Sequence, residues 1–293
     1  MSERDMGVHG HTPRAARLVI YTILVLVALL YLTPLYVIIV TSLKSLQEIH
    51  TGNLLALPLH ITFKPWQEAW ASACSGATCK GVQVYFWNSV HMVIPAVLIS
   101  TAFGAINGYV LTKWRFRGSD LFFSLLLVGT FIPFQMILLP MAWVLGKMNM
   151  DNTIPGLVMV HVIYGLAFTT LFFRNFYVTI PNELVKAAMI DGAGFFTIFW
   201  RILLPVSTPI FMVTIIWQFT QIWNDFLFGV VFTSGALHPI TVALNNLVNT
   251  STGVRQYNVE MAAAMIAALP TFIVYLVAGK YFVRGLTAGS VKG

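Results

Sequence analysis

The stretch PNELVKAAMIDGAGFFTIFWRILLPVSTP, residues 181–209, lies between two long apolar segments, yet it contains charged residues, prolines and glycines of its own. Pro181 interrupts the apolar segment before it, because proline lacks the backbone N–H that a helix needs. Asn182 is a residue type that caps helix N-termini, and Glu183 places negative charge where the helix dipole favours it. A short helix is therefore expected here, with Asn182 as its cap.

The same stretch predicts the end of this helix and the start of a second one. The first helix is expected to end at Asp191-Gly192, because glycine adopts the left-handed conformation that closes many helices. Residues 194–204 predict a second, aromatic-rich helix that stops at Pro205. Two short helices joined by a glycine turn would make a hook outside the membrane, with an alanine face suited to docking in a partner protein.

The composition excludes a soluble domain. Of the 293 residues, 58% are hydrophobic and 9% are charged, and the mean hydropathy is +0.80. Only helices or closed barrels satisfy backbone groups in lipid, and the apolar runs lack the alternation of a barrel. The sequence therefore predicts an all-α membrane protein. Its net charge of +7 is spread over loops, which indicates control of membrane topology and not a nucleic-acid partner.

Hydropathy predicts six spans of about 20 residues or more, preceded by a cytoplasmic segment at residues 1–17. No small-residue cleavage site follows the first span, so we expect no cleaved signal peptide. Of the 17 Lys and Arg residues, twelve fall on the side of the N-terminus and five on the other side. This bias places both termini and the hook in the cytoplasm. The transmembrane domain is expected at 18–293, with spans at 18–41, 88–112, 121–145, 154–173, 207–232 and 261–282.

The hook resembles the cytoplasmic loop of ABC-importer permeases, whose pattern reads P-x-E-L-x-E-A-A-x-x-D-G-A and, further on, L-P-x-x-x-P. The chain departs from this pattern at Lys186, where the family has Glu, so the contacts of that Glu do not carry over. A generic amphipathic loop is the alternative. The matching residues are Pro181, Glu183, Leu184, Ala187, Ala188, Asp191, Gly192, Ala193, Leu204, Pro205 and Pro209.

Two further motifs resemble the same family. GYVLTKWRFRG, residues 108–118, alternates basic and aromatic residues, which by physical argument alone indicates an anchor at the inner membrane surface. It is also similar to a run that follows the second span of these permeases. Gly104 and Gly108 form a pair that permits close approach of another helix. The ending KYFVRGLTAGSVKG is similar to that of sugar permeases, and residues 286–293 are expected to contact the same partner as the hook.

The resemblance implies an all-α, MetI-like permease fold with six transmembrane helices and a cytoplasmic coupling loop at residues 178–205. It implies a non-enzymatic subunit, without a cofactor, of a binding-protein-dependent sugar importer in the bacterial inner membrane. Its partners would be a second homologous permease, two cytoplasmic ATPase subunits, a periplasmic sugar-binding protein and membrane lipid. The residues that the resemblance assigns to ATPase coupling are Glu183, Ala187, Ala188, Asp191, Gly192 and Ala193.

The substrate class also follows from resemblance. The motifs look like those of maltose-type permeases, and FWNSV at residues 86–90, the 108–118 run and the cysteine loop look most similar to glucose or mannose permeases. A permease for another carbohydrate, such as a disaccharide, is the alternative. A self-sufficient secondary carrier would need internal repeats and ionisable relays, and the spans show no clear repeat and one acid.

The fifth predicted span carries a polar face. Gln218, Gln221 and Asp225 recur at i, i+3 and i+7, and Trp217, Gln221 and Asn224 do likewise. Lipid does not tolerate such a face, so it should line a protein interior or a wet cavity. Amides and a carboxylate exchange hydrogen bonds with hydroxyls, and Trp stacks on C–H faces, so these residues are a candidate sugar pathway. A buried contact between helices is an equal alternative.

The outer loop at residues 42–87 is expected to form a structured cap with an interfacial helix. Its Cys74 and Cys79 are the only cysteines, and an oxidising compartment favours a disulfide, with free thiols or half of a metal site as alternatives. No His, Cys, Asp or Glu cluster has metal spacing, and no phosphate-binding G-x-x-x-x-G-K-[ST] loop is present. The single histidines His91 and His161 are expected to be packed or interfacial.

Overall fold

The computed structural model describes residues 14–76, 78–249 and 254–288, with side chains up to residue 279. Four helices in this part are long and apolar enough to cross a membrane, and two bent helix pairs raise the number to six if each pair is one span. The predicted all-α membrane fold is thereby confirmed. The side chains of the C-terminal motif, the tail and residues 1–13 lie outside the description. The four long helices are α1 (Arg14–Ser42), α4 (Gln83–Lys113), α7 (Ile154–Thr179) and α14 (Tyr257–Ala288).

The third predicted span is bent. Helix α5 (Ser119–Phe131) meets the segment formed by η1 (Phe134–Ile137) and α6 (Leu138–Lys147) at an angle of 99°. The predicted span at 121–145 is therefore not one straight helix. The cause is Pro133, which lacks an N–H and disfavours helical geometry in the residue before it. Ile132 is accordingly extended, with φ −68° and ψ 121°.

The fifth predicted span, 207–232, is also not a single helix. Helix α11 (Thr208–Trp223) ends at Asn224, and α12 (Leu227–Phe232) begins after a short break. The carboxylate of Asp225 accepts hydrogen bonds from the backbone N–H groups of Phe228 and Gly229, at 3.3 and 3.1 Å. It thereby satisfies the first turn of α12, which makes a new helix start favourable at this point.

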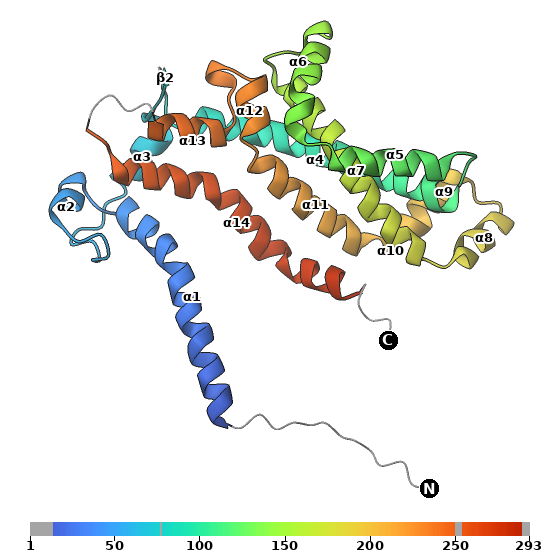
Figure 1. Ribbon diagram of the computed structural model, residues 1–293, viewed down its shortest axis with the longest axis horizontal. Helices are drawn as coiled ribbons and strands as arrows, with labels where there is room; N and C mark the ends of the chain where they lie inside the picture. The colour runs from blue at the N-terminus through green and yellow to red at the C-terminus, as the bar shows by residue number, and fades with distance from the viewer. Residues whose placement is uncertain (1–13, 77, 250–253, 289–293) are drawn as a thin grey trace.

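Helices α4 and α7 lie side by side and form the centre of the bundle (Figure 1). Gly104 and Gly108 of α4 permit this approach. A Cβ at Gly104 would lie 2.8 Å from the carbonyl carbon of Thr169, and one at Gly108 would lie 2.7 Å from Phe173 Cβ. The predicted close approach at this glycine pair is confirmed. The hydroxyl of Thr169 also donates to the carbonyl oxygen of Ser100 across the interface, at 3.0 Å.

Helix α11 packs against both α4 and α14, whereas α1 leans away from the bundle (Figure 1). Of the residues in α1, Val40, Thr41 and Ser42 at its C-terminal end are buried. Most of the rest of this helix is apolar and exposed within the chain. A helix that is hydrophobic all round is stable only when lipid or another protein covers it. The exposure of α1 therefore fits a membrane environment.

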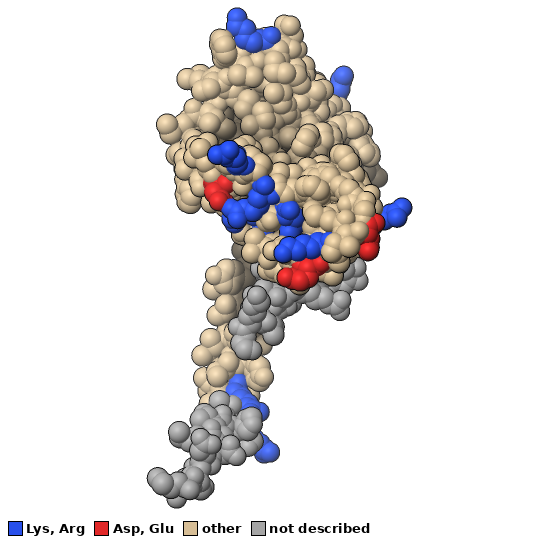
Figure 2. All heavy atoms as spheres, turned by 90° about the vertical axis from the view of Figure 1, so that its right-hand side faces the viewer, with Lys and Arg blue, Asp and Glu red and all other residues tan. Residues whose placement is uncertain are grey.

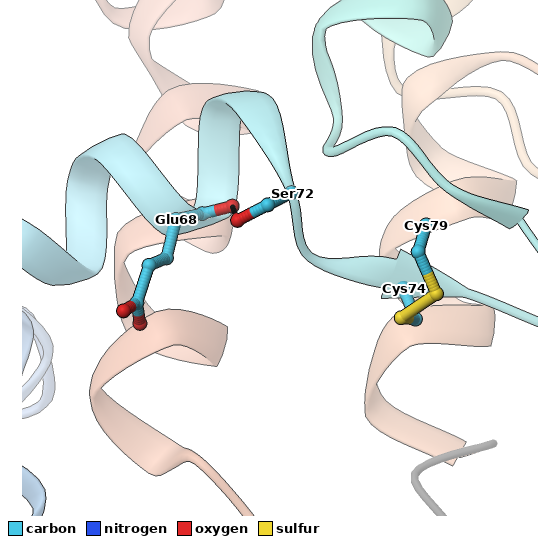
Figure 3. The surroundings of a disulfide bond; sticks show 4 residues. All are labelled: Glu68, Ser72, Cys74 and Cys79. Carbon is cyan, nitrogen blue, oxygen red and sulfur yellow. Dashed lines mark hydrogen bonds between the residues drawn. A yellow bond between two sulfur atoms is a disulfide. The ribbon is translucent and has the colours of Figure 1, made fainter.

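The 42–87 loop folds into α2 (Leu46–Thr51), α3 (Lys64–Ala71) and a hairpin of β1 (Cys74–Ser75) and β2 (Thr78–Cys79). A disulfide joins Cys74 to Cys79 across the hairpin, beside the end of α3 (Figure 3). The buried hydroxyl of Ser75 donates to the carbonyl oxygen of Ala243 in α13 (Ile240–Asn249), at 3.0 Å. The hairpin is thus tied to the segment that precedes α14.

The segment η3 (Gly235–Leu237) is held against α4 by an amide side chain. Asn88 Nδ2 donates to the carbonyl oxygens of Ala236 and His238, at 2.7 and 3.0 Å. Burial lowers the pKa of the His238 imidazole below its usual range, and a backbone hydrogen bond at Gly229 opposes this effect in part. His238 is therefore neutral at pH 7, which suits its ring contact with the Thr233 hydroxyl at 3.0 Å.

The glycine contact between α4 and α7 can be tested by Gly104→Ala. The new methyl group would clash with the backbone of Thr169, and we expect a loss of about 1–3 kcal/mol of stability, as for other overpacked sites. The thermal unfolding midpoint of the detergent-solubilised protein should fall by several degrees. Gly129→Ala in α5 is the control, because nothing lies within 4 Å of its added Cβ and alanine favours helix. Equal midpoints for Gly104→Ala and the unmodified protein would contradict the account.

Candidate functional site

The first helix of the hook is α8 (Asn182–Ile190), and its start differs from the prediction. Pro181 occupies the cap position and makes no side-chain cap hydrogen bond, while Asn182 is already the first helical residue. The predicted capping role of Asn182 is therefore wrong. Its Oδ1 instead accepts a hydrogen bond from Lys113 Nζ of α4, at 2.7 Å. Glu183 lies in the first turn, as expected.

The end of α8 was predicted correctly. Asp191 is the C-cap, and Gly192 comes next with φ +81°. The N–H of Gly192 donates to Met189 O at 3.0 Å, and the N–H of Ala193 donates to Ala188 O at 2.9 Å. These two bonds form a Schellman motif, which satisfies the last carbonyl groups and turns the chain sharply. The hook thus has a defined corner at Gly192.

The second half of the hook is longer than predicted. It contains α9 (Phe195–Ile198), a π-helical turn η2 (Phe199–Leu203) and α10 (Leu204–Val206). The prediction that Pro205 ends this helix is wrong, because Pro205 lies in the first turn of α10, where its missing N–H is tolerated. The chain then bends by 79° into α11. The hook is therefore joined to α11 almost without a linker.

The hook has a buried face and an exposed apolar face. Val185 and Ala188 pack inward in one cluster with Tyr177, Ile198 and Phe199. Of the residues assigned to coupling, Ala188 is thus buried and Ala193 half-buried, while the other four are exposed: Glu183, Ala187, Asp191 and Gly192. Large apolar side chains lie exposed beside them, with exposed fractions of 48% for Leu184, 87% for Ile190, 68% for Phe196 and 60% for Trp200.

The 108–118 run supports the hook directly, a role that the anchor interpretation of its basic residues missed. Lys113 Nζ donates to the carbonyl oxygen of Ile180 at 2.6 Å as well as to Asn182. The Tyr109 ring lies 4.7 Å from the Phe195 ring, and its hydroxyl accepts a hydrogen bond from the Trp114 indole. The end of α4 therefore fixes both halves of the hook.

The end of the molecule that carries the hook is basic. Figure 2 shows Lys and Arg side chains gathered there, with fewer acidic side chains among them. The chain segments at this end contain acids at Asp120, Glu183 and Asp191, and Arg115 pairs with Asp120. Basic residues in these segments are Lys113, Arg115, Arg117, Arg174, Lys186 and Arg201.

A cavity of about 550 Å³ lies at the end of α11 that is away from the hook, between the last turns of this helix, α7 and the break before α12. It is mixed in chemistry, with aromatic rings from several elements and a few polar groups, as is usual for small-molecule sites. All five residues of the predicted polar face line it: Trp217, Gln218, Gln221, Asn224 and Asp225. The structure adds residues that the sequence did not suggest, among them Phe134, His161, Tyr164 and Phe228.

The polar residues are not one helical face, because the helix ends before the last two of them. Gln218 is buried, and its Nε2 donates to Ser100 Oγ of α4 at 2.8 Å, which is a contact between helices. Asn224 Nδ2 donates to the carbonyl oxygen of Thr220 in its own helix, at 2.9 Å. Gln221 and Asn224 are exposed to the cavity side. The alternative of a contact between helices therefore applies to Gln218, whereas Gln221 and Asn224 stay open to the cavity.

Aromatic rings support the wall of the cavity at Trp217. The Trp217 ring contacts those of Phe168 and Phe172, with 4.9 and 5.3 Å between the ring centres. On α7, His161 is 5% exposed, and its Nε2 lies 3.7 Å from Asp225 Oδ2. His161 is buried, as expected. Nothing in the sequence indicated that a carboxylate lies next to it. His91 is exposed beside Trp87.

The described residues contain no group of three His, Cys, Asp or Glu side chains that could hold a metal ion.

Comparison with known proteins agrees with this geometry. Residues 100–287 match the family of the binding-protein-dependent transport system inner membrane component. A probable ABC transporter permease protein of Pyrococcus horikoshii is 38% identical over 94% of this chain and 98% of its own. A xylose/arabinose import permease of Haloferax volcanii is 33% identical, over 91% of this chain and 90% of its own.

Two further similarities concern a sugar importer and the fold. The permease of a glucose import system of Saccharolobus solfataricus is 29% identical, over 93% of this chain and 95% of its own. A chain in the crystal structure of a bacterial ABC transporter involved in the import of alginate aligns with a TM-score of 0.79 at 21% identity. The alignment covers 92% of this chain and 99% of that one, so the two share a fold.

Lys113→Met tests how the hook is held. Loss of the hydrogen bonds to Ile180 and Asn182 should destabilise α8 locally by about 1–1.5 kcal/mol. Amide hydrogen exchange in residues 181–193 should then quicken roughly 5- to 10-fold, while exchange in the centre of α4 and α7 stays unchanged. Arg117→Met is the control, because Arg117 is exposed four residues further on. Unchanged exchange in the hook of Lys113→Met would show that this lysine does not hold it.

Proposed function

The chain belongs to the family of binding-protein-dependent transport system inner membrane components, and we propose that it forms the path for a monosaccharide, glucose or mannose, in a sugar importer. As an ABC importer permease it is not an enzyme, since ATP hydrolysis takes place on a separate subunit. The observation that supports a sugar path is the cavity of about 550 Å³, in which aromatic rings and uncharged amides lie together.

The chemistry of the cavity fits a neutral sugar. Gln221 and Asn224 present amides that both donate and accept hydrogen bonds, as hydroxyl groups do. Trp217 supplies an aromatic surface on which C–H groups of a sugar ring can pack. Relatives are named for glucose and xylose/arabinose import as well as for diacetylchitobiose and arabinooligosaccharides. The choice of a monosaccharide therefore rests on the resemblance of the 86–90 motif, the 108–118 run and the cysteine loop to glucose or mannose permeases.

The hook is proposed as the part that receives force from the ATPase. Its exposed apolar side chains, Leu184, Ile190, Phe196 and Trp200, would enter a cleft of a cytoplasmic ATPase subunit. Gly192 fixes the angle between the two halves of the hook, and Glu183, Ala187, Ala188, Asp191 and Ala193 shape the helix that docks. Closure of the ATPase dimer would move the hook as one body and with it α11.

The proposed assembly contains this chain, a second homologous permease, two ATPase subunits and a periplasmic sugar-binding protein in the inner membrane. Both termini and the hook would then lie in the cytoplasm, in keeping with the distribution of basic residues and with the basic end of the molecule in Figure 2. The hairpin with the Cys74–Cys79 disulfide would face the oxidising periplasm.

The experiment that tests this function is purification of the tagged protein from native membranes, followed by reconstitution with its companions. We expect an ATPase with a phosphate-binding loop and a second six-span permease to copurify. With the binding protein and ATP, the vesicles should take up labelled D-glucose or D-mannose faster than D-xylose, L-arabinose or maltose. Faster uptake of maltose would contradict the monosaccharide assignment, and uptake without ATP or companions would contradict the importer itself.

A further inference from the structure

The cavity beside α11 contains one polar atom that the rest of the structure leaves without a partner. His161 is 5% exposed, and within the described part of the chain its Nε2 makes no hydrogen bond. A buried nitrogen in this state is costly, because it has lost water without gaining another partner. Nearly all buried polar atoms in native proteins have a hydrogen-bond partner, so we expect a ligand to supply one for this nitrogen.

The nearest polar group to this nitrogen is the carboxylate of Asp225. The distance from His161 Nε2 to Asp225 Oδ2 is 3.7 Å, which is too long for a direct hydrogen bond. An oxygen atom placed about 2.8–3.0 Å from each would bridge the two groups. Asp225 Oδ2 already accepts from the Gly229 N–H, but a carboxylate has lone pairs for a further donor.

Other contacts hold both side chains in place, so the distance between them is fixed. The His161 ring packs edge-on against Phe228, with 5.4 Å between the ring centres. Asp225 is fixed by the two N–H groups of α12 and by its own carbonyl oxygen, which accepts from Thr241 Oγ1 at 2.5 Å. Both residues line the cavity that also contains Gln221 and Asn224.

We propose that His161 and Asp225 together bind one hydroxyl group of the transported sugar. A hydroxyl fits this gap because it can donate its one proton to the carboxylate while its oxygen accepts a hydrogen bond from His161 Nε2–H, in the tautomer that carries the proton on this nitrogen. The proposal rests on the proposed function in that the ligand is a sugar. It adds a binding residue on α7, opposite the amides of α11, so that the sugar is held from two helices.

The test compares hydroxyl dependence between variants in the reconstituted importer. Uptake of D-glucose and of its monodeoxy analogues is measured for the unmodified protein, His161→Ala, His161→Gln and His91→Ala. Selection by the binding protein is common to all of them and cancels in the ratios. His161→Ala should reduce D-glucose uptake by about threefold to tenfold, as for one lost hydrogen bond of about 0.5–1.5 kcal/mol. For the one deoxy analogue that lacks the bound hydroxyl, the same substitution should cause little further loss of uptake.

The variants separate binding from folding. His161→Gln should keep part of the uptake, because its amide can also reach a hydroxyl, and His91→Ala should behave as the unmodified protein, since His91 is exposed on α4. An equal loss of uptake for D-glucose and every deoxy analogue in His161→Ala would assign His161 a structural role and overturn the proposal. Unchanged uptake of all of them would also overturn it.

A second measurement does not depend on transport. With ¹⁵N-labelled histidine, the imidazole signal that is lost in His161→Gln should shift saturably as D-glucose, D-xylose or maltose is added to the solubilised assembly. A shift without D-glucose uptake would support the hydroxyl site while the proposed glucose transport fails. No shift with any of the three sugars would indicate that only water fills the gap and would overturn the site.

Discussion

The close approach of α4 and α7 at Gly104 and Gly108 is the contact on which the rest of the structure depends. Side chains larger than hydrogen at these two positions would meet Thr169 and Phe173. Because the two helices touch there, the end of α4 reaches the hook, where Lys113 bonds to Ile180 and Asn182. Toward the cavity, His161 of α7 lines it, and Ser100 of α4 accepts a hydrogen bond from Gln218, which lines it as well.

The hook and the cavity are linked by α11 as well as by the glycine contact. This helix follows the hook after the bend at Ser207 and ends at Trp223, next to the break that carries Asp225. Gln218, in the middle of α11, is bonded to Ser100 of α4. A movement of the hook would therefore act on a helix that packs against the central pair and borders the cavity along its last turns. A rigid corner at Gly192 would make such transmission efficient.

The sequence predicted the all-α class, the corner at Gly192 and the glycine contact because each depends on local chemistry that a single residue type reveals. It did not predict the breaks at Ile132 and Asn224. The apolar runs on either side are continuous, and only the local effect of Pro133 and the carboxylate of Asp225 interrupts them. Asn182 was predicted as a cap from its residue type, but its side chain instead accepts a hydrogen bond from Lys113, which lies in a distant segment. His161 gave no signal because its neighbour Asp225 is remote in sequence.

If the hook transmits ATP hydrolysis to the sugar path as a rigid lever, the most direct measurement of this role is the number of ATP molecules hydrolysed per sugar imported. Gly192→Val should raise this ratio several-fold in the assembled importer, because a β-branched residue is strained at φ +81°. Gly194→Val should leave it unchanged, since Gly194 has φ −83° and open space around its Cβ. A normal ratio in Gly192→Val, with the complex fully assembled, would contradict the lever.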